Sequence, residues 1–261
     1  MADARQAGAG RIIDLNADMG EGFGPYRLGD DAAMLDVVSS ANVACGFHAG
    51  DPQIMATTFG LARDMEVAVG AHPGFPDLWG FGRRTMTFSQ REIVHMVAYQ
   101  VGAAQGMGRL CGVPVRYVKV HGALANMAET RHDVAAAILD GIESAGPGLP
   151  VLAIAHSALD GLCRERRRRC YSEIFADRAY DEHGHLLPRS HPGAVLHDPE
   201  DIARRAMRMV RGGYIETIGG RMVETRIDSI CVHGDTPDAV GIARALRRHL
   251  ESEGVIIRAF A

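Results

Sequence analysis

The sequence lacks several features that would mark a redox site, an export signal or a membrane span. Its five cysteines are odd in number and include no Cys-x-x-Cys pair, and three lie in or beside apolar runs, where a reduced cysteine packs as a small hydrophobic residue. No apolar run approaches the roughly 18 residues that a membrane-spanning helix needs. Residues 1–10 also lack the apolar core of a signal peptide. We therefore expect a soluble, cytoplasmic protein whose residues 1–10 form a disordered lead-in.

The common motifs of nucleotide sites and hydrolases are also absent. The chain contains no Gly-x-x-x-x-Gly-Lys-Ser/Thr, Gly-x-Gly-x-x-Gly, His-Glu-x-x-His or Gly-x-Ser-x-Gly sequence. Any nucleotide site is therefore not of the P-loop or Rossmann kind, and a serine-hydrolase elbow is unsupported. The formal net charge of -4 gives no reason to expect nucleic acid or an anionic membrane as a partner.

Short apolar runs alternate with longer segments of helical periodicity along the whole chain. The candidate strands are residues 11–16, 41–47, 67–71, 116–120, 150–155, 171–176 and 228–232. The candidate helices are residues 30–38, 52–65, 89–110, 131–145, 157–169, 199–211 and 237–252. This alternation, with no long linker, predicts one α/β domain over residues 11–261, a closed (β/α) barrel of about seven units. Residues 212–226 interrupt the pattern as an irregular excursion or a small hairpin.

Polar residues follow nearly every candidate strand. In a parallel barrel these strand ends converge on one mouth, which is where active sites lie. A single histidine at a strand end is more often structural, but a set of them at equivalent positions predicts a site. In chain order the candidates are Asp14 and Asn16, His48 and Asp51, His72, Lys119 and His121, His156, Asp177 and Arg178, and His233 and Asp235.

The glycine-rich loop at residues 70–84 is too long to be a simple connector. It is either a packed surface loop or a partial lid whose Arg83 and Arg84 meet a carboxylate or a phosphate. Two other features are less informative. The basic residues of 163–170 are typical of a helix C-terminus, and the loop with His183, His185 and His191 only weakly suggests a metal site.

Two kinds of reaction suit such a mouth. In metal-assisted hydrolysis, Asp14 with His48 and His72 would hold a divalent ion that activates water. In carbonyl activation by a nucleotide, Lys119 and arginines would neutralise phosphate charge while a carboxylate or histidine acts as general base. The spacing of the residues does not choose between the two.

Six motifs in this chain closely resemble the LamB/YcsF family. In order they are DLNADMGEGFG, SSANVACGFHAGDP, GAHPGFPDLWGFGRR, VKVHGAL, EIFADRAY and VHGD, and the resemblance runs from about residue 11 to residue 256. It implies a TIM-like (β/α)7 barrel of the glycoside hydrolase/deacetylase type. It also implies ATP-dependent opening of the lactam of 5-oxo-L-proline to L-glutamate, jointly with partner subunits B and C of a 5-oxoprolinase. ATP would be the co-substrate, with Mg²⁺, and no organic prosthetic group is expected.

The resemblance also implies which residues form the site. Those expected to be catalytic are Asp14, Asn16, His48, His72, Lys119, His121, Asp177 and His233. We further expect substrate or phosphate to be bound by Glu21, Asp51, Arg83, Arg84, Arg178 and Asp235. The chain departs from the family pattern at Ala17, Val120 and Ala125, and only Ala125, after His121, would change the pocket, by widening it.

Two other functions remain open on the sequence. One is a stand-alone metal-dependent hydrolase or deacetylase acting on an amide or a sugar-derived substrate, which would bind a divalent metal and work without ATP. The other is a non-catalytic scaffold that only positions its partners. In a scaffold, replacing His48 or Asp177 with alanine would leave the activity of the complex intact.

Overall fold

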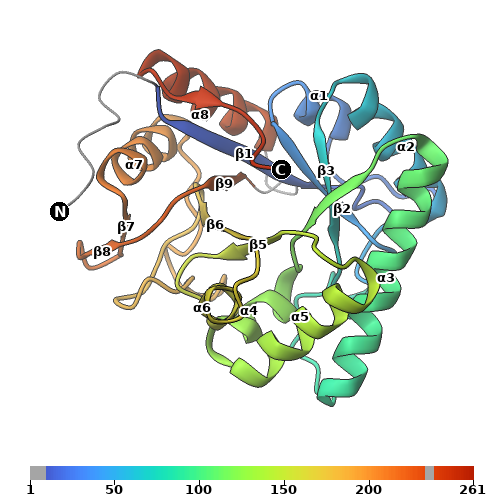
Figure 1. Cartoon of the computed structure of the whole chain (residues 1–261). Helices are drawn as coiled ribbons and strands as arrows, with labels where there is room; N and C mark the ends of the chain where they lie inside the picture. The colour runs from blue at the N-terminus through green and yellow to red at the C-terminus, as the bar shows by residue number, and fades with distance from the viewer. Residues whose placement is uncertain (1–9, 233–237) are drawn as a thin grey trace.

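Seven parallel strands close into a barrel in this computed structural model, which describes residues 10–232 and 238–261 (Figure 1). They are β1 (Ile12–Met19), β2 (Ser40–Ala44), β3 (Ala68–His72), β4 (Val115–Val118), β5 (Val151–Ile154), β6 (Cys170–Phe175) and β9 (Ser229–Val232). Each strand pairs with the next in this order, and β9 pairs with β1 to close the ring. The short β10 (Ile256–Ile257) adds to the start of β1. The predicted seven-stranded α/β barrel is therefore confirmed.

Helices surround the barrel, with α7 and α8 side by side at one edge (Figure 1). They are α1 (Asp31–Leu35), α2 (Pro52–Asp64), α3 (Gln90–Cys111), α4 (Gly122–Thr130), α5 (His132–Ala145), α6 (Ala158–Glu165), α7 (Pro199–Gly212) and α8 (Ala239–Ser252). Side-chain caps start α2, α3 and α7 at Asp51, Ser89 and Asp198. Helix α4 was not predicted. No helix in the described ranges combines the length and apolar character needed to cross a membrane.

Between β6 and β9 the chain leaves the barrel pattern. This excursion contains α7 and an antiparallel hairpin of β7 (Tyr214–Glu216) and β8 (Met222–Glu224). The hairpin alternative predicted for residues 212–226 is therefore confirmed. The lead-in predicted for residues 1–10 lies almost wholly outside the described residues, as do the predicted site residues His233 and Asp235.

Strand β1 separates an apolar face from a polar one. Successive side chains of a strand point to opposite faces. Ile13, Leu15, Ala17 and Met19 join the apolar core, whereas Asp14, Asn16 and Asp18 make hydrogen bonds across the barrel interior. The prediction that β1 ends near Asn16 was wrong, because the strand continues to Met19. Asp18 is consequently the inward residue nearest its C-terminal end.

The polar interior of the barrel is fully buried and internally hydrogen-bonded. Asp14 accepts hydrogen bonds from the hydroxyls of Ser39 (2.7 Å), Ser40 (2.6 Å) and Ser229. Burial raises the pKa of Asp14, and these hydroxyls partly offset that rise. Asn16 occupies the next level, where its amide donates to Ser229 at 2.7 Å. Both residues predicted for the mouth therefore lie below it.

Tyr117 fills the interior opposite Gly70. A Cβ atom on Gly70 would lie 2.3 Å from the tyrosine ring, so only glycine leaves room for it. The Tyr117 hydroxyl then donates a hydrogen bond of 2.7 Å to the side-chain oxygen of Asn42. These contacts close the middle of the barrel and leave the C-terminal ends of the strands as its open end.

Candidate active site

Three histidines and a glutamate form a compact cluster at the barrel mouth. His72 is the last residue of β3, His121 directly precedes α4, and His48 follows β2. Glu21 follows β1. One donor atom from each of the four lies within 4.8 Å of the others, and all four side chains are buried. Strand ends thus deliver these groups to one place, as the strand pattern predicts.

The hydrogen bonds of His72 and His121 fix where their protons lie. His72 Nδ1 is 2.7 Å from the carbonyl oxygen of Lys119, and His121 Nε2 is 2.9 Å from that of Phe81. A carbonyl oxygen only accepts, so both nitrogens carry hydrogen. In neutral rings, the lone pairs of His72 Nε2 and His121 Nδ1 then face each other across 3.0 Å.

His48 stacks on His121. The two rings are parallel within 3°, with centroids 3.7 Å apart, and His48 Nε2 is 3.5 Å from Glu21 Oε1. Among the described residues, neither nitrogen of His48 has a hydrogen-bond partner. Burial, followed by the charges of the neighbouring histidines, lowers the pKa of both His48 and His121 well below the ordinary value. Both rings are therefore neutral and offer lone pairs.

Lys119 connects the histidine cluster to the barrel interior. Its ammonium lies 3.1 Å from carboxylate oxygens of both Asp18 and Glu173, and Asp18 is also 3.3 Å from His72 Nε2. Burial by itself would lower the pKa of Lys119, but the carboxylates of Asp18 and Glu173, together with the hydrogen bond to Cys231, raise it well above its usual range. The mouth therefore holds a permanent cation between two carboxylates.

A cavity of about 600 Å³ opens above this polar floor. Asp18, His72, Lys119, His121 and Glu173 line its base. Its remaining charged and polar lining residues are Arg83, Asn126, Glu129, Thr130, Arg178, Asp181, His185 and Arg189. The cavity thus combines lone-pair donors at its floor with guanidinium groups around it, a set able to bind an anionic substrate and transfer its protons.

The two arginines of the loop at residues 70–84 have different roles. Arg83 lines the cavity and lies over the Phe81 ring at 4.9 Å. Arg84 forms an ion pair with Asp77 of its own loop. The lid interpretation therefore fits Arg83 and the packed-loop interpretation fits Arg84. Trp79 of the same loop is 97% exposed and contributes nothing to the cavity lining.

The structure brings only part of the predicted site together. The predicted residues at the mouth are Glu21, His48, His72, Arg83, Lys119, His121 and Arg178. Asp14, a predicted metal ligand, lies among hydroxyls in the barrel interior rather than with the histidines. Asp177 is buried but does not line the cavity, and His156 lines a separate hollow with Arg164.

Four carboxylates of the cavity were not predicted: Asp18, Glu129, Glu173 and Asp181. Asp18 could have been found by extending the alternation of β1, because it follows Asn16 by two. Glu173 already lies inside the predicted strand 171–176, two residues before Phe175, and could have been found from the alternation there. Glu129 lies on α4, so it could not be placed without that helix.

Asp51 is a helix cap. Its carboxylate accepts hydrogen bonds from the amides of Gln53 (2.8 Å) and Ile54 (2.9 Å) at the start of α2, and from Gly24 (2.8 Å). We expect Asp51→Ala to lower the free energy of unfolding by about 1 kcal/mol and to leave the KM for substrate unchanged. Denaturant unfolding and steady-state kinetics check this, with the cap variant Ser89→Ala as a matched control. A tenfold rise in KM for Asp51→Ala alone would instead assign it to substrate binding.

Glu129 is an acid of the cavity whose charge depends on pH near neutrality. Burial raises its pKa from 4.5 to about 7, against the opposing effects of the Leu186 amide and Arg178. Because a raised pKa disfavours the carboxylate in the folded state, stability falls as pH rises from 4.5 through 7.

The wild type should lose about 3 kcal/mol of its free energy of unfolding between pH 4 and pH 8 through Glu129, and Glu129→Gln should not show this loss. The difference between variant and wild type should therefore shift by about 3 kcal/mol in favour of the variant over that range. Denaturant unfolding of both proteins at the two pH values measures this. An equal difference at both pH values would contradict the assignment.

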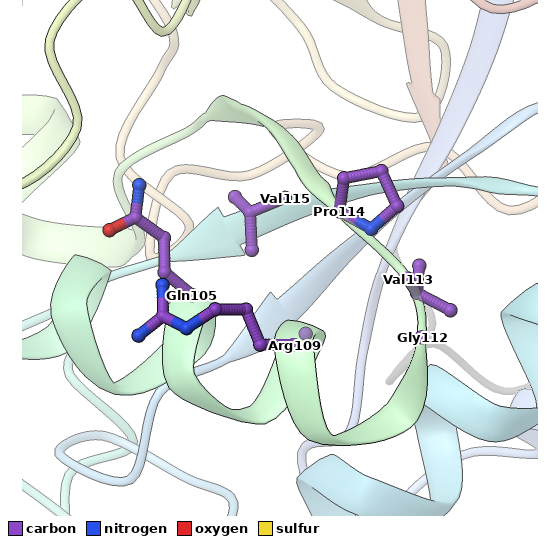
Figure 2. Close-up of a pocket in the computed structure, with 7 residues that line it drawn as sticks. Gln105, Arg109, Gly112, Val113, Pro114 and Val115 are labelled. Carbon is purple, nitrogen blue, oxygen red and sulfur yellow. The ribbon is translucent and has the colours of Figure 1, made fainter.

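Another hollow lies at the other end of the barrel, where α3 ends and β4 begins (Figure 2). It has a volume of about 300 Å³ and is lined by Gln105, Gly108, Arg109, Gly112, Val113, Pro114 and Val115. It contains no carboxylate or histidine side chain. The mouth cavity, whose floor joins Lys119, two carboxylates and two histidines by direct contacts, is the candidate active site.

Comparison with known proteins agrees with this architecture. A protein from Gluconobacter oxydans, named as the A subunit of 5-oxoprolinase, is 55% identical over 95% of this chain and 98% of its own length. The protein of the same name from Ruegeria pomeroyi is 50% identical over 95% of this chain and 98% of its own length. The crystal structure of a lactam utilization protein from Thermus thermophilus superposes with a TM-score of 0.90 at 44% identity, covering 95% of this chain and 100% of the other.

A model of the LamB/YcsF family matches residues 13–261, which include every described strand from β2 onward and nearly all of β1. The match spans both the barrel and the four residues of the histidine cluster. With the relatives above, it shows that this chain belongs to the LamB/YcsF family.

Proposed function

We propose that this chain is the component of a 5-oxoprolinase that opens the lactam ring of 5-oxo-L-proline to give L-glutamate. The relatives named as the A subunit of 5-oxoprolinase, aligned over almost their whole length, support this assignment. The observation that carries it is the polar floor of the mouth cavity, where Lys119, Asp18 and the His72–His121 pair lie in direct contact.

Each part of the reaction has matching groups in the cavity. The guanidinium groups of Arg83 and Arg178 suit the substrate carboxylate. The charge of Lys119 stabilises negative charge that develops on the lactam oxygen when water attacks the carbonyl carbon. Asp18 accepts the proton of that water, and the lactam nitrogen takes up a proton as the C–N bond breaks.

An unstrained lactam is a poor electrophile, so we further propose that ATP activates it. Transfer of the γ-phosphoryl group to the lactam oxygen would release ADP. Attack by one water on the activated carbon, with cleavage of the C–N bond, would give γ-glutamyl phosphate, and a second water would release phosphate and L-glutamate. ATP would arrive with Mg²⁺, and Arg83, Arg178 and Arg189 would face the phosphate charge. The chain carries no P-loop motif, so partner subunits B and C are proposed to complete the nucleotide site. Five free cysteines among the described residues fit a cytoplasmic location.

Reconstitution tests this function. The full chain, mixed with subunits B and C, is expected to release L-glutamate and ADP in equal amounts from 5-oxo-L-proline and ATP. Omitting any one of the three proteins should abolish glutamate release. Absence of glutamate with all three folded and associated would overturn the assignment.

A stand-alone metal-dependent hydrolase remains the second candidate, and the cluster of Glu21 with three histidines favours it. It requires the isolated chain to cleave an amide without ATP and to lose that activity with a chelator. Glutamate release that depends strictly on ATP and on both partner proteins would exclude it.

A further inference from the structure

The facing nitrogens of His72 and His121 need a cation beside them. Each ring donates its other N–H group to a backbone carbonyl, so two lone pairs meet at 3.0 Å. Such an arrangement is repulsive unless a proton or a metal ion lies between or next to the nitrogens. A backbone carbonyl that orients the far side of an imidazole is also the usual support of a metal-binding histidine.

Two further donors complete the set. Glu21 Oε1 lies 3.6 Å from His121 Nδ1 and 3.5 Å from His48 Nε2. His48 is 1% exposed, and no described residue forms a hydrogen bond with its nitrogens, which is costly for a polar ring unless a ligand uses it. Donor atoms bound to a tetrahedral zinc ion lie about 3.3 Å apart. Three of the six separations between donor atoms in the cluster, 3.0, 3.5 and 3.6 Å, bracket that value, and all six lie within 4.8 Å.

We propose that Glu21, His48, His72 and His121 bind one divalent transition-metal ion of the zinc type at the barrel mouth. Three imidazole nitrogens and one carboxylate select zinc, cobalt or nickel over magnesium and calcium, which prefer oxygen ligands. The site is therefore distinct from the Mg²⁺ that accompanies ATP. The inference rests on the proposed function and deepens it, because such an ion polarises a carbonyl or activates water.

The surroundings of the cluster fit this role. Gly74 and Gly82 leave the space that His48 occupies, since a Cβ atom on Gly74 would lie 2.6 Å from His48 Nδ1. A metal ion lies in the plane of an imidazole that binds it, so one of the parallel rings of His48 and His121 tilts on binding. Asp18, 3.3 Å from His72 Nε2, is left to accept a proton.

Metal binding can be measured on the full chain without substrate, nucleotide or partner. After dialysis against a chelator, the chain is titrated with zinc by calorimetry and with cobalt by visible absorption. We expect one equivalent of each metal and a cobalt spectrum of low coordination number. Glu21→Gln and His121→Gln should each weaken zinc binding by at least about 100-fold. The exposed His132→Gln should bind as the wild type does.

Circular dichroism of each variant checks that the barrel is folded. Because two ligand variants are tested, the experiment still gives a result if one of them does not fold. The proposal is overturned if the wild type binds no stoichiometric zinc, or if the ligand variants bind it as tightly as His132→Gln. Nitrogen-15 spectra that show a proton shared by His72 and His121 in zinc-saturating solution would also overturn it. If the wild-type chain bound one zinc ion but the reconstituted complex did not turn over 5-oxoproline, the result would count against the proposed function and not against the metal site.

Discussion

Replacing Lys119 with methionine is expected to abolish glutamate release and to lower the free energy of unfolding by about 3–5 kcal/mol. Methionine keeps much of the volume of the side chain but removes its charge. Asp18 and Glu173, both within 3.1 Å of the ammonium, would then be buried without their cation. The substitution therefore removes both the electrostatic support of the reaction and a buried ion-pair network.

Denaturant unfolding at pH 7 measures the loss of stability, and Arg131→Met is a suitable control. Arg131 forms an exposed ion pair with Asp133, so its loss should cost no more than about 1 kcal/mol. Lys119 is the only lysine of the chain, so lysine-labelled protein gives one side-chain ammonium signal. It should show that the ammonium stays protonated well above pH 10.5. The contribution of the charged Lys119 to the free energy of unfolding should be lost only as pH rises through its raised pKa. A Lys119→Met protein as stable as the control would contradict the assignment.

The second large effect is expected at His121. His121→Gln should lower kcat of the reconstituted complex by about 10²–10⁴-fold, because it removes the nitrogen that faces His72 across 3.0 Å. Its own stability should change much less than that of Lys119→Met, since glutamine still has an amide group that can donate to the Phe81 carbonyl.

Steady-state kinetics and size-exclusion chromatography together distinguish a catalytic role from a scaffold role. His121→Gln should associate with its partners as the wild type does and yet turn over slowly, whereas the exposed His132→Gln should be fully active. If the His121→Gln complex assembled and retained normal kcat, the chain would be a scaffold for chemistry performed elsewhere.

Much of the fold and part of the site could be predicted because the barrel repeats one local pattern. Short buried strands that end in a polar residue placed His48, His72, Lys119 and His121 correctly at the mouth. Asp14 was predicted to lie at the mouth but lies deeper in the barrel, because the predicted strand ended at Asn16 whereas β1 continues to Met19. After Asn16 the strand is apolar only at alternate positions, Ala17 and Met19, so the apolar run that marked the strand ends early. Asp18 lies between them and faces Lys119 and His72.

Other parts of the site depend on long-range contacts that local patterns do not encode. Helix α4 starts directly after His121 with a glycine of positive φ and without a side-chain cap, so its start carries no sequence signal. Arg83 and Arg84 are neighbours of the same type, yet only Arg84 meets Asp77, an outcome that the loop geometry decides. The position of Glu21 beside the three histidines likewise depends on how the barrel brings the ends of its strands together.

The most direct test of a reaction site at the barrel mouth is a crystal structure of this chain with 5-oxo-L-proline bound. We predict that the ligand occupies the cavity, with its carboxylate against Arg83 or Arg178 and its lactam group beside His72, His121 and Lys119. Density for the ligand at any other surface, with the mouth cavity empty at saturating concentration, would contradict the account.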